Sequence, residues 1–355
     1  MNVLLHSNSI KQLTIAVSGL NANDNPGPGL AVIRALRDGF GEDLRIIGLA
    51  YETLEPAIYM RNEVDKTYRI PYPTAGIGAL RERLEYIQEI EHIDVLIPNF
   101  DAELYNFVKL EKDLLRMGIK TFLPTLQQLA QRDKINLKAF GDQHNFKVPA
   151  DKTIFTDAEI QSASEEFGFP LVIKGKFYEA QVVYSFADAR SAFYKLQAKW
   201  GLPVIAQQFI RGTEINIAAL GDGLGNTLSV IPMRKLYITE KGKAWAGITI
   251  EDDNLIALAR DFCKATSWKG GFELEIMKDD QENLFIMEVN PRFPAWIYLT
   301  AAAGQNQPKA LVELALGKGI EQFKYYKTGK MFVRFAWDNI VDVEDFQKLS
   351  AFGEL

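Results

Sequence analysis

Two neighbouring segments decide the fold of this chain: Gly270-Gly-Phe-Glu-Leu-Glu-Ile-Met277 and Leu284-Phe-Ile-Met-Glu-Val-Asn-Pro-Arg-Phe293. Each is an apolar run interrupted by polar residues, and a polar stretch separates them. This pattern predicts two antiparallel strands joined by a turn. Because side chains alternate between the two faces of a strand, Glu288 and Asn290 share one face, and Glu275 on the partner strand is expected opposite them.

The chemistry of these three side chains predicts a cation site. Two carboxylates and an amide offer oxygen ligands, and Mg²⁺ is a hard cation that proteins hold through one or two carboxylates together with nucleotide phosphates. A carboxylate at the end of an apolar strand also needs a partner, because burying an unpaired charge is costly. The alternative is that Glu275 and Glu288 form salt bridges to Arg292 or Lys278 on a solvated edge. The spacing alone leaves both interpretations open.

The residues around these strands extend the same sheet. Residues 214–220 and 227–231 are strand-like and flank a turn rich in glycine, aspartate and asparagine, which predicts a hairpin. A helix is expected over 253–266 and a late strand over 331–336. The last third of the chain is therefore predicted to be mainly antiparallel sheet.

The first third alternates short apolar runs with segments of helical periodicity. Apolar residues recur at helical spacing over 30–40, 80–87 and 104–115. Strands that alternate with helices imply a parallel, doubly wound sheet. The expected strands cover 13–18, 44–49, 93–97 and 119–123.

The middle of the chain predicts a small α+β unit. Thr156-Asp-Ala-Glu159 fits a capping box at the start of a helix, and Ser185 opens a second helix. The polar run up to residue 134 is expected to be the junction that precedes this unit. Its strands are expected over 171–174, 181–185 and 204–208.

The composition is that of a globular protein with two or three domains. The chain has 355 residues, of which 47% are hydrophobic and 24% are charged, and this excludes a disordered tail, a collagen-like repeat and a coiled coil. A net charge of −6 argues against a nucleic-acid partner. The single Cys263 suits a reducing compartment. With neither a signal peptide nor a membrane-length apolar run, a cytoplasmic protein with no membrane partner is expected.

The motif Met287-Glu-Val-Asn-Pro-Arg292 resembles the metal-binding signature of the ATP-grasp superfamily, and it looks most like the branch of carbamoyl-phosphate synthase large subunits and biotin carboxylases. The resemblance covers most of the chain in order. It implies a pre-ATP-grasp α/β domain over 1–124 and an ATP-grasp domain over 125–355. Within the second domain it implies a small lid at about 151–209 and a larger antiparallel-sheet subdomain, with the metal and catalytic residues, at about 210–355.

The resemblance also implies which residues bind ATP. Lys134 and Lys174 match two lysines that contact the phosphates, and Glu214 matches the acidic residue on the ribose hydroxyls. The segment just before Glu214 matches the hinge that contacts adenine. Its cofactor-binding residues would be Gln207, Gln208, Phe209 and Ile210.

A second group of residues is implied for the metal and the transferred group. Glu275, Glu288 and Asn290 match the ligands of Mg²⁺, with Mn²⁺ as an alternative ion. Arg292 matches the arginine near the transferred phosphate or acyl group. Arg234, with Lys235 beside it, lies in a region that often supplies a basic phosphate contact, and we expect Arg234 to make it. The alternative for both is a solvated basic strand face.

The chain departs from the family pattern in the loop that should close over the phosphates. The segment Gly175-Lys-Phe-Tyr-Glu-Ala180 has a single glycine, so a cradle of successive backbone N–H groups is weaker here. Lys176 is expected to supply charge instead.

Two loops of the N-terminal domain are candidates for the substrate site. They follow the first strand (18–25) and the strand that ends at residue 97 (98–103), where ligands of open α/β sheets bind. Asp101 and Glu103 would either bind an amine or order the start of a helix. The glycine pattern is not G-x-G-x-x-G, which excludes an NAD site.

Taken as an ATP-grasp protein, the chain is expected to be an ATP-dependent ligase. A substrate carboxylate would form an acyl-phosphate at the expense of ATP, and an amine, or less readily a thiol, would then displace phosphate. The partners would be small molecules or a peptide, and a homodimer is common in the family. The alternatives are a phosphotransferase acting on bicarbonate or carbamate, like carbamoyl-phosphate synthase, and an ATP-binding sensor or subunit without catalysis.

Overall fold

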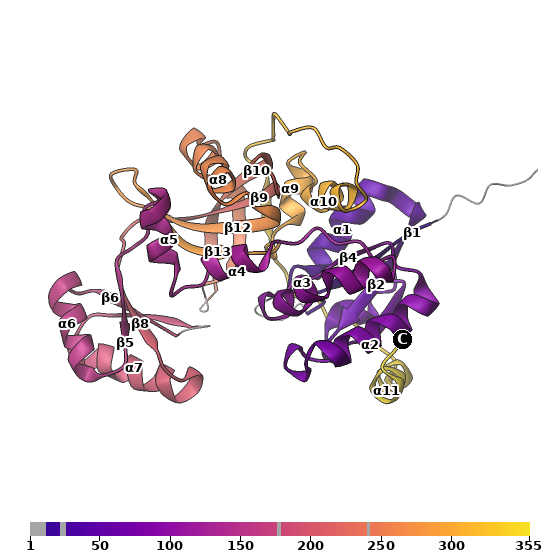
Figure 1. Ribbon diagram of the computed structural model, residues 1–355, viewed down its shortest axis with the longest axis horizontal. Coiled ribbons are helices and arrows are strands. Elements are labelled where there is room, and N and C mark those ends of the chain that lie inside the picture. The colour runs from indigo at the N-terminus through magenta and orange to yellow at the C-terminus, as the bar shows by residue number, and fades with distance from the viewer. Residues whose placement is uncertain (1–11, 22–25, 176–178, 240–241) are drawn as a thin grey trace, which may run out of the picture. The chain divides into compact units, whose positions relative to one another are not determined.

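The chain folds into two compact units. The computed structural model describes residues 12–21, 26–175, 179–239 and 242–355. The first unit comprises Met1–Leu123, Arg292–Glu321 and Arg334–Leu355, and the second comprises Pro124–Pro291 and Gln322–Val333. In Figure 1 the colour runs from indigo at the N-terminus to yellow at the C-terminus, so the late segments of the first unit stand out in yellow among indigo and purple elements. The C-terminal residues thus return to complete the N-terminal unit.

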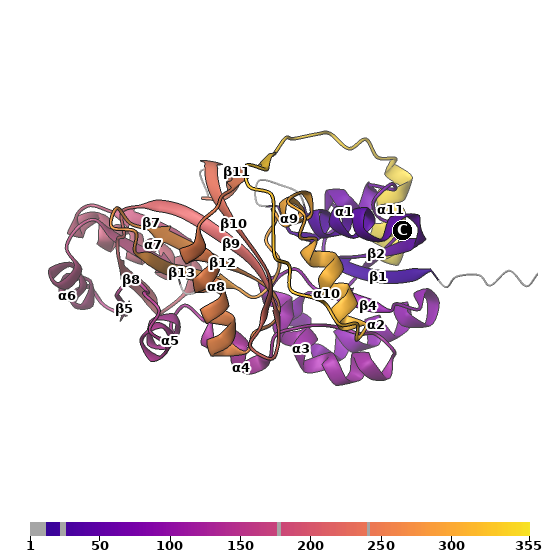
Figure 2. The same ribbon diagram turned by 90° about the horizontal axis from the view of Figure 1, so that it is seen from above.

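The core of the first unit is a four-stranded parallel sheet in the order β3-β2-β1-β4. This confirms the predicted doubly wound arrangement. Figure 2 shows α1 on one side of these strands and α2 and α3 on the other. The strands are β1 (Leu13–Ser18), β2 (Leu44–Ala50), β3 (Lys66–Arg69) and β4 (Val95–Ile97), and the main helices are α1 (Gly29–Phe40), α2 (Ile77–Glu91) and α3 (Asp101–Arg116).

The strand predicted over 119–123 was wrong. Only Lys120 pairs with β4, through an isolated parallel bridge to Val95. Ile119 and Leu123 are nevertheless buried. Their apolar character therefore reflects packing against the sheet rather than membership of its hydrogen-bonded ladder.

The last residues of the chain add to the edge of the parallel sheet. Glu354 forms an antiparallel bridge with Tyr68 of β3, and the backbone of Leu355 exchanges two hydrogen bonds with Thr67. An edge strand presents unpaired backbone groups, and here the C-terminus covers part of them. The remaining helices of this unit are η1 (Gly41–Asp43), η2 (Pro56–Tyr59), η3 (Pro73–Ala75), α9 (Tyr298–Ala302), α10 (Gln307–Ala315) and α11 (Val343–Phe352).

The second unit contains a six-stranded antiparallel sheet in the order β13-β12-β9-β10-β11-β14. One face packs on α8 (Asp253–Thr266) and α5 (Leu137–His144) in a core rich in aromatic rings. A short helix, α4 (Leu126–Gln131), precedes α5. The strands are β9 (Thr213–Asp222), β10 (Thr227–Ile238), β11 (Ala244–Thr249), β12 (Lys269–Lys278), β13 (Leu284–Asn290) and β14 (Met331–Val333).

A smaller antiparallel sheet, in the order β5-β8-β6-β7, forms the predicted α+β unit. Two helices cover one of its faces around a separate apolar core. The Thr156–Glu159 capping box is present at the first of them, as predicted. The elements are β5 (Asp151–Ile154), α6 (Asp157–Phe167), β6 (Leu171–Gly175), β7 (Ala180–Val183), α7 (Phe186–Trp200) and β8 (Val204–Gln208).

Across the described ranges, no helix has both the length and the apolar character needed to cross a lipid bilayer.

Candidate active site

One face of the six-stranded sheet carries a row of polar side chains. Glu275 of β12 lies directly opposite Glu288 of β13 and, on its other side, opposite Asn216 of β9. Glu273 lies opposite Asn290. The predicted pairing of Glu275 with Glu288 is confirmed, and the sheet places three carboxylates and two amides on three adjacent strands.

The alternation of residues explains why these polar groups share a face. Ile215 and Ile217 on β9 and Leu274 on β12 point to the opposite face, where they are buried in the core beneath α8. A slip of one residue in register would bury the carboxylates and expose the apolar set, so burial specifies the register strongly. A bulge follows Glu275, where the ladder shifts between Glu275 and Ile276.

Glu273 is a site residue that the sequence analysis missed. It is buried, and its two carboxylate oxygens accept hydrogen bonds from Asn216 Nδ2 at 2.6 Å and from Asn290 Nδ2 at 2.9 Å. Asn290 Nδ2 also lies 3.1 Å from Glu275 Oε1. The signal was present in the Glu-x-Glu spacing of Glu273 and Glu275, because residues two apart on a strand share a face.

Lys235, rather than Arg234, lies on the carboxylate face. Lys235 Nζ donates to Glu214 Oε2 at 2.8 Å, and its side chain is only 9% exposed. Burial alone would lower the pKa of Lys235, but the charges of Glu275 and Glu214 outweigh it and raise this pKa. Arg234 is exposed and pairs in register with Ile215, which places it on the other face of the sheet. The phosphate contact expected of Arg234 remains a prediction.

The two lysines predicted to contact phosphate lie near the same carboxylates. Lys134 Nζ is 3.6 Å from Glu288 Oε2. Burial lowers the pKa of Lys174, and the charge of Lys134 lowers it further, whereas Glu288 and Glu275 act in the opposite direction. Lys134 and Lys174 thus lie near Glu275 and Glu288. Such a group can bind a polyanion through the lysines and its metal ion through the carboxylates.

The predicted hinge runs from the end of β8 into the loop before β9. Gln208 donates its backbone N–H to the carbonyl oxygen of Ala150 at 2.8 Å, and Ile210 is buried while Phe209 is partly buried. Gln207 is buried opposite Asp151, and its Oε1 has no hydrogen-bond partner within the described structure. An acceptor in that state suits a ligand that donates a hydrogen bond.

The alternative for Glu275 and Glu288 was a salt bridge to Arg292 or Lys278, and the structure shows which ion pairs these two cations form. Lys278 pairs with Asp252 at 2.9 Å and with Glu282. Arg292 belongs to the first unit, where its Nε lies 3.3 Å from Asp101 Oδ1. Both side chains of that pair are largely buried.

The loop candidates of the first unit contain a buried carboxyl group. Glu103 accepts hydrogen bonds from the hydroxyls of Ser18 and Tyr51 and from the backbone N–H groups of Asn99 and Phe100. Burial raises the pKa of Glu103. Of the two predicted roles for Glu103, ordering the start of α3 agrees with these contacts. Residues 22–25 of the other loop, as well as Lys176, lie outside the described residues.

The donor set on the sheet fits a hard cation. Glu275 and Glu288 supply carboxylate oxygens, and Asn290 supplies an amide oxygen once its nitrogen is engaged by Glu273. In the described ranges, no group of three or more His, Cys, Asp or Glu side chains is arranged to hold a metal by itself. The set therefore suits Mg²⁺, which completes its shell with water and substrate phosphates rather than with a full protein cage.

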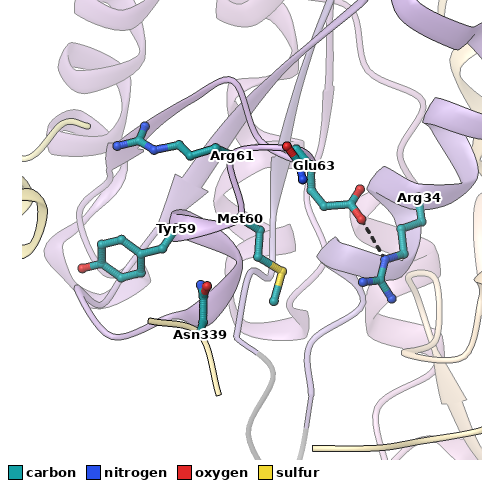
Figure 3. Close-up of a pocket in the computed structure, with 7 residues that line it drawn as sticks. Arg34, Tyr59, Met60, Arg61, Glu63 and Asn339 are labelled. Atoms are coloured by element: carbon teal, nitrogen blue, oxygen red, sulfur yellow. Dashed lines mark hydrogen bonds and ion pairs between the residues drawn. The ribbon is translucent and has the colours of Figure 1, made fainter. Parts of the chain in front are cut away.

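A separate pocket lies in the first unit. It has a volume of about 330 Å³ and is lined by residues around Met60 and by Asn339 of the C-terminal segment. Figure 3 shows Arg34 directed toward Glu63, and this ion pair measures 3.0 Å. Arg61 pairs with Asp345 at 3.0 Å. Both arginines that line the pocket therefore already form ion pairs with carboxylates. The pocket lining contains none of the predicted site residues.

Comparison with known proteins adds an independent result. Residues 202–335 match the family model described as ATP-grasp in the biosynthetic pathway with Ter operon. D-alanine–D-alanine ligase of Bordetella pertussis is 33% identical over 95 residues, which are 26% of this chain and 30% of that protein. The large chain of carbamoyl phosphate synthase from Clostridium acetobutylicum is 23% identical over 235 residues, which are 61% of this chain and 22% of that protein. The matched parts thus span less than a third of either relative.

The fold is also similar to a solved structure. The biotin carboxylase domain of 2-oxoglutarate carboxylase from Hydrogenobacter thermophilus, crystallised with MgADP and bicarbonate, has a TM-score of 0.67. The sequence identity is 15%, and the match covers 89% of this chain and 72% of that one. At this identity the likeness concerns the fold.

Proposed function

We propose that this chain, which belongs to the ATP-grasp superfamily, is a Mg²⁺-dependent ligase that uses ATP to join a carboxylate to an amine. The observation that carries the proposal is the pairing of Glu275 with Glu288 on a sheet face that also holds buried amides and is bordered by lysines. This combination serves a polyphosphate with its divalent cation. A protein that only stores or senses nucleotide has less need of the complete set.

Each cation has a role in binding the triphosphate. Lys134, Lys174 and Lys235 would neutralise phosphate oxygens. Glu214 would exchange its ion pair with Lys235 for hydrogen bonds that it accepts from the ribose hydroxyls. Mg²⁺, when bound by Glu275, Glu288 and Asn290, would supply the charge that neutralises the β- and γ-phosphates. Phosphoryl transfer is catalysed mainly by positioning and charge stabilisation, and no nucleophile of the protein is required.

The chemistry would proceed in two steps. A substrate carboxylate oxygen attacks the γ-phosphorus of ATP, the bond to the β-phosphate oxygen breaks, and ADP and an acyl-phosphate result. The amine nitrogen then attacks the acyl carbon, phosphate leaves, and the amine loses a proton. Arg292 would hold the carboxylate, because a guanidinium matches its two oxygens.

The proposal also covers the substrates and the assembly of the chain. The acid and the amine would be small molecules or the end of a peptide, and a homodimer is the proposed assembly. The Hydrogenobacter domain was crystallised as a dimer with MgADP, and these features support both ATP with Mg²⁺ and the dimer for this chain.

The test is ADP release in the presence of Mg²⁺ with panels of carboxylic acids and amines. We expect sustained ADP release only when an acid and an acceptor are both supplied, because the acid alone can form no more than one ADP with its acyl-phosphate at each site. Glu288→Gln should abolish turnover while the fold survives, and Glu282→Gln, in the exposed turn of the same hairpin, serves as the matched control. Full activity of the Glu288 variant would refute the metal assignment. ATP binding without turnover under every condition would favour a sensor.

A further inference from the structure

Glu273 holds two amide side chains that come from different strands. It lies on β12 between Asn216 of β9 and Asn290 of β13, and each amide nitrogen donates to a different oxygen of its carboxylate, at 2.6 Å and 2.9 Å. All three residues are at most 5% exposed. A buried network of this kind is rigid when its hydrogen bonds are satisfied.

The chemistry of a carboxylate decides how these amides are oriented. An ionised carboxylate only accepts hydrogen bonds, whereas an amide can present either its NH₂ group or its oxygen. Glu273 therefore selects the NH₂ group of both Asn216 and Asn290. For Asn290, Glu275 Oε1 is a second acceptor of the same NH₂ group, at 3.1 Å. The oxygen of each amide is consequently directed away from Glu273, in the one orientation that makes it an acceptor for something else.

Asn216 shows the consequence of this orientation. Its Oδ1 is buried and has no hydrogen-bond partner in the part of the chain that the structure describes. A buried acceptor without a partner is destabilising, because it has lost its hydrogen bond to water and gained none in return. Asn216 stands directly opposite Glu275, which itself faces Glu288. The unsatisfied oxygen thus lies on the face that carries the two paired carboxylates.

We infer that Glu273 is a positioning residue that turns the amide oxygens of Asn216 and Asn290 toward the cation bound on this face. The inference rests on the proposed function only in that the cation is the one that accompanies ATP. Groups that orient metal ligands in this way typically contribute about 10- to 100-fold to metal affinity. Glu273 itself accepts from both amides and acts through them.

The first test replaces Glu273 by glutamine and measures Mn²⁺ binding in the presence of ADP by electron paramagnetic resonance of the free ion. Glutamine has one NH₂ group where the carboxylate had an acceptor, so one asparagine must turn its oxygen toward residue 273. We expect the Kd for Mn²⁺ to rise about 10- to 100-fold. Glu282→Gln is the matched control and should leave this Kd unchanged. An unchanged Kd in Glu273→Gln would overturn the inference.

A compensating change separates orientation from general packing. In the double variant Glu273→Gln with Asn290→Asp, the glutamine NH₂ group can donate to the new carboxylate, which again offers an oxygen to the cation. We expect Mn²⁺ to bind about tenfold more tightly than in Glu273→Gln alone. If the double variant binds as weakly as the single variant, Glu273 serves packing and the inference fails. Should Glu273→Gln not fold, Glu273→Asp keeps the charge, shortens the reach and should weaken Mn²⁺ binding equally.

A metal-free measurement keeps this inference distinct from the proposed function. The side-chain amide protons of Asn216 and Asn290 should exchange slowly with solvent in the wild-type protein without metal, and at least one pair should exchange faster in Glu273→Gln. If the wild-type protein binds no Mn²⁺ with ADP, the proposed function fails while this exchange result still reports on the anchoring. If both amides exchange identically in the two proteins, the anchoring is absent.

Discussion

Arg292 lies against Asp101, with Nε 3.3 Å from Oδ1, although the two residues are almost two hundred positions apart in the sequence. Their side chains are 18% and 22% exposed. In water-exposed positions such a pair contributes little, but partial burial strengthens the attraction. Asp101 is thus the counter-charge beside the arginine that we propose as the carboxylate contact.

This pair predicts a measurable coupling in stability. We expect a double-mutant cycle with Asp101→Asn and Arg292→Gln to give an interaction energy of about 0.5–3 kcal/mol, since contacting charges couple within this range. Urea unfolding of the four proteins provides the measurement. Strict additivity would mean that the two side chains do not interact in solution.

Lys174 predicts a proton uptake on binding ATP. Burial and the charge of Lys134 lower the pKa of Lys174 in the free protein, and a bound phosphate would raise this pKa again. At a pH between the pKa of Lys174 in the free protein and its pKa in the ATP complex, Lys174 takes up a proton when ATP binds. The affinity for ATP should therefore fall as the pH rises from the first pKa to the second. Calorimetry in buffers of different ionisation enthalpy measures the uptake. It should vanish in Lys174→Arg, which stays protonated, and its persistence there would assign the proton elsewhere.

The neighbours Lys235 and Arg234 offer a matched pair of substitutions. Lys235→Met should weaken ATP binding by about 10- to 100-fold, because a charge-assisted hydrogen bond contributes about 1.5–3 kcal/mol. Arg234→Met, on the other face of the sheet, should change it far less. Nucleotide titration of both variants decides which residue contacts phosphate. The reverse order would restore Arg234 as the phosphate contact.

Glu103 predicts how the stability of the first unit depends on pH. Burial raises the pKa of Glu103 in the folded state above its unfolded value of 4.5. The folded chain therefore retains a proton that the unfolded chain releases, and this contribution to stability is lost as the pH rises above 4.5 through the folded pKa. Glu103→Gln, which cannot ionise, should flatten this part of the curve. Urea unfolding at several pH values measures it, and parallel curves would contradict the assignment.

The local patterns of the sequence predicted much of the fold. The helix over Asp253–Thr266 agrees with its predicted range, and so do the two strands that carry Glu275 and Glu288. These predictions succeeded because apolar periodicity and helix caps depend on neighbours within a few residues. The strand predicted over 119–123 failed for the complementary reason. Buried apolar residues look alike whether or not their backbone finds a partner strand, and only Lys120 finds one.

For the candidate site, the sequence by itself determined that Glu288 and Asn290 share a strand face, since a period of two is a local property. It predicted Glu275 opposite them, and the register places Glu275 opposite Glu288. The tertiary structure decided that Lys235 faces the carboxylates, and that Glu273 joins Asn216, 57 positions away, to Asn290, 17 positions away. Those contacts depend on the strand order β13-β12-β9-β10, which follows from burying the apolar face of all these strands together. No window of sequence contains that order, because it is a property of the packed core.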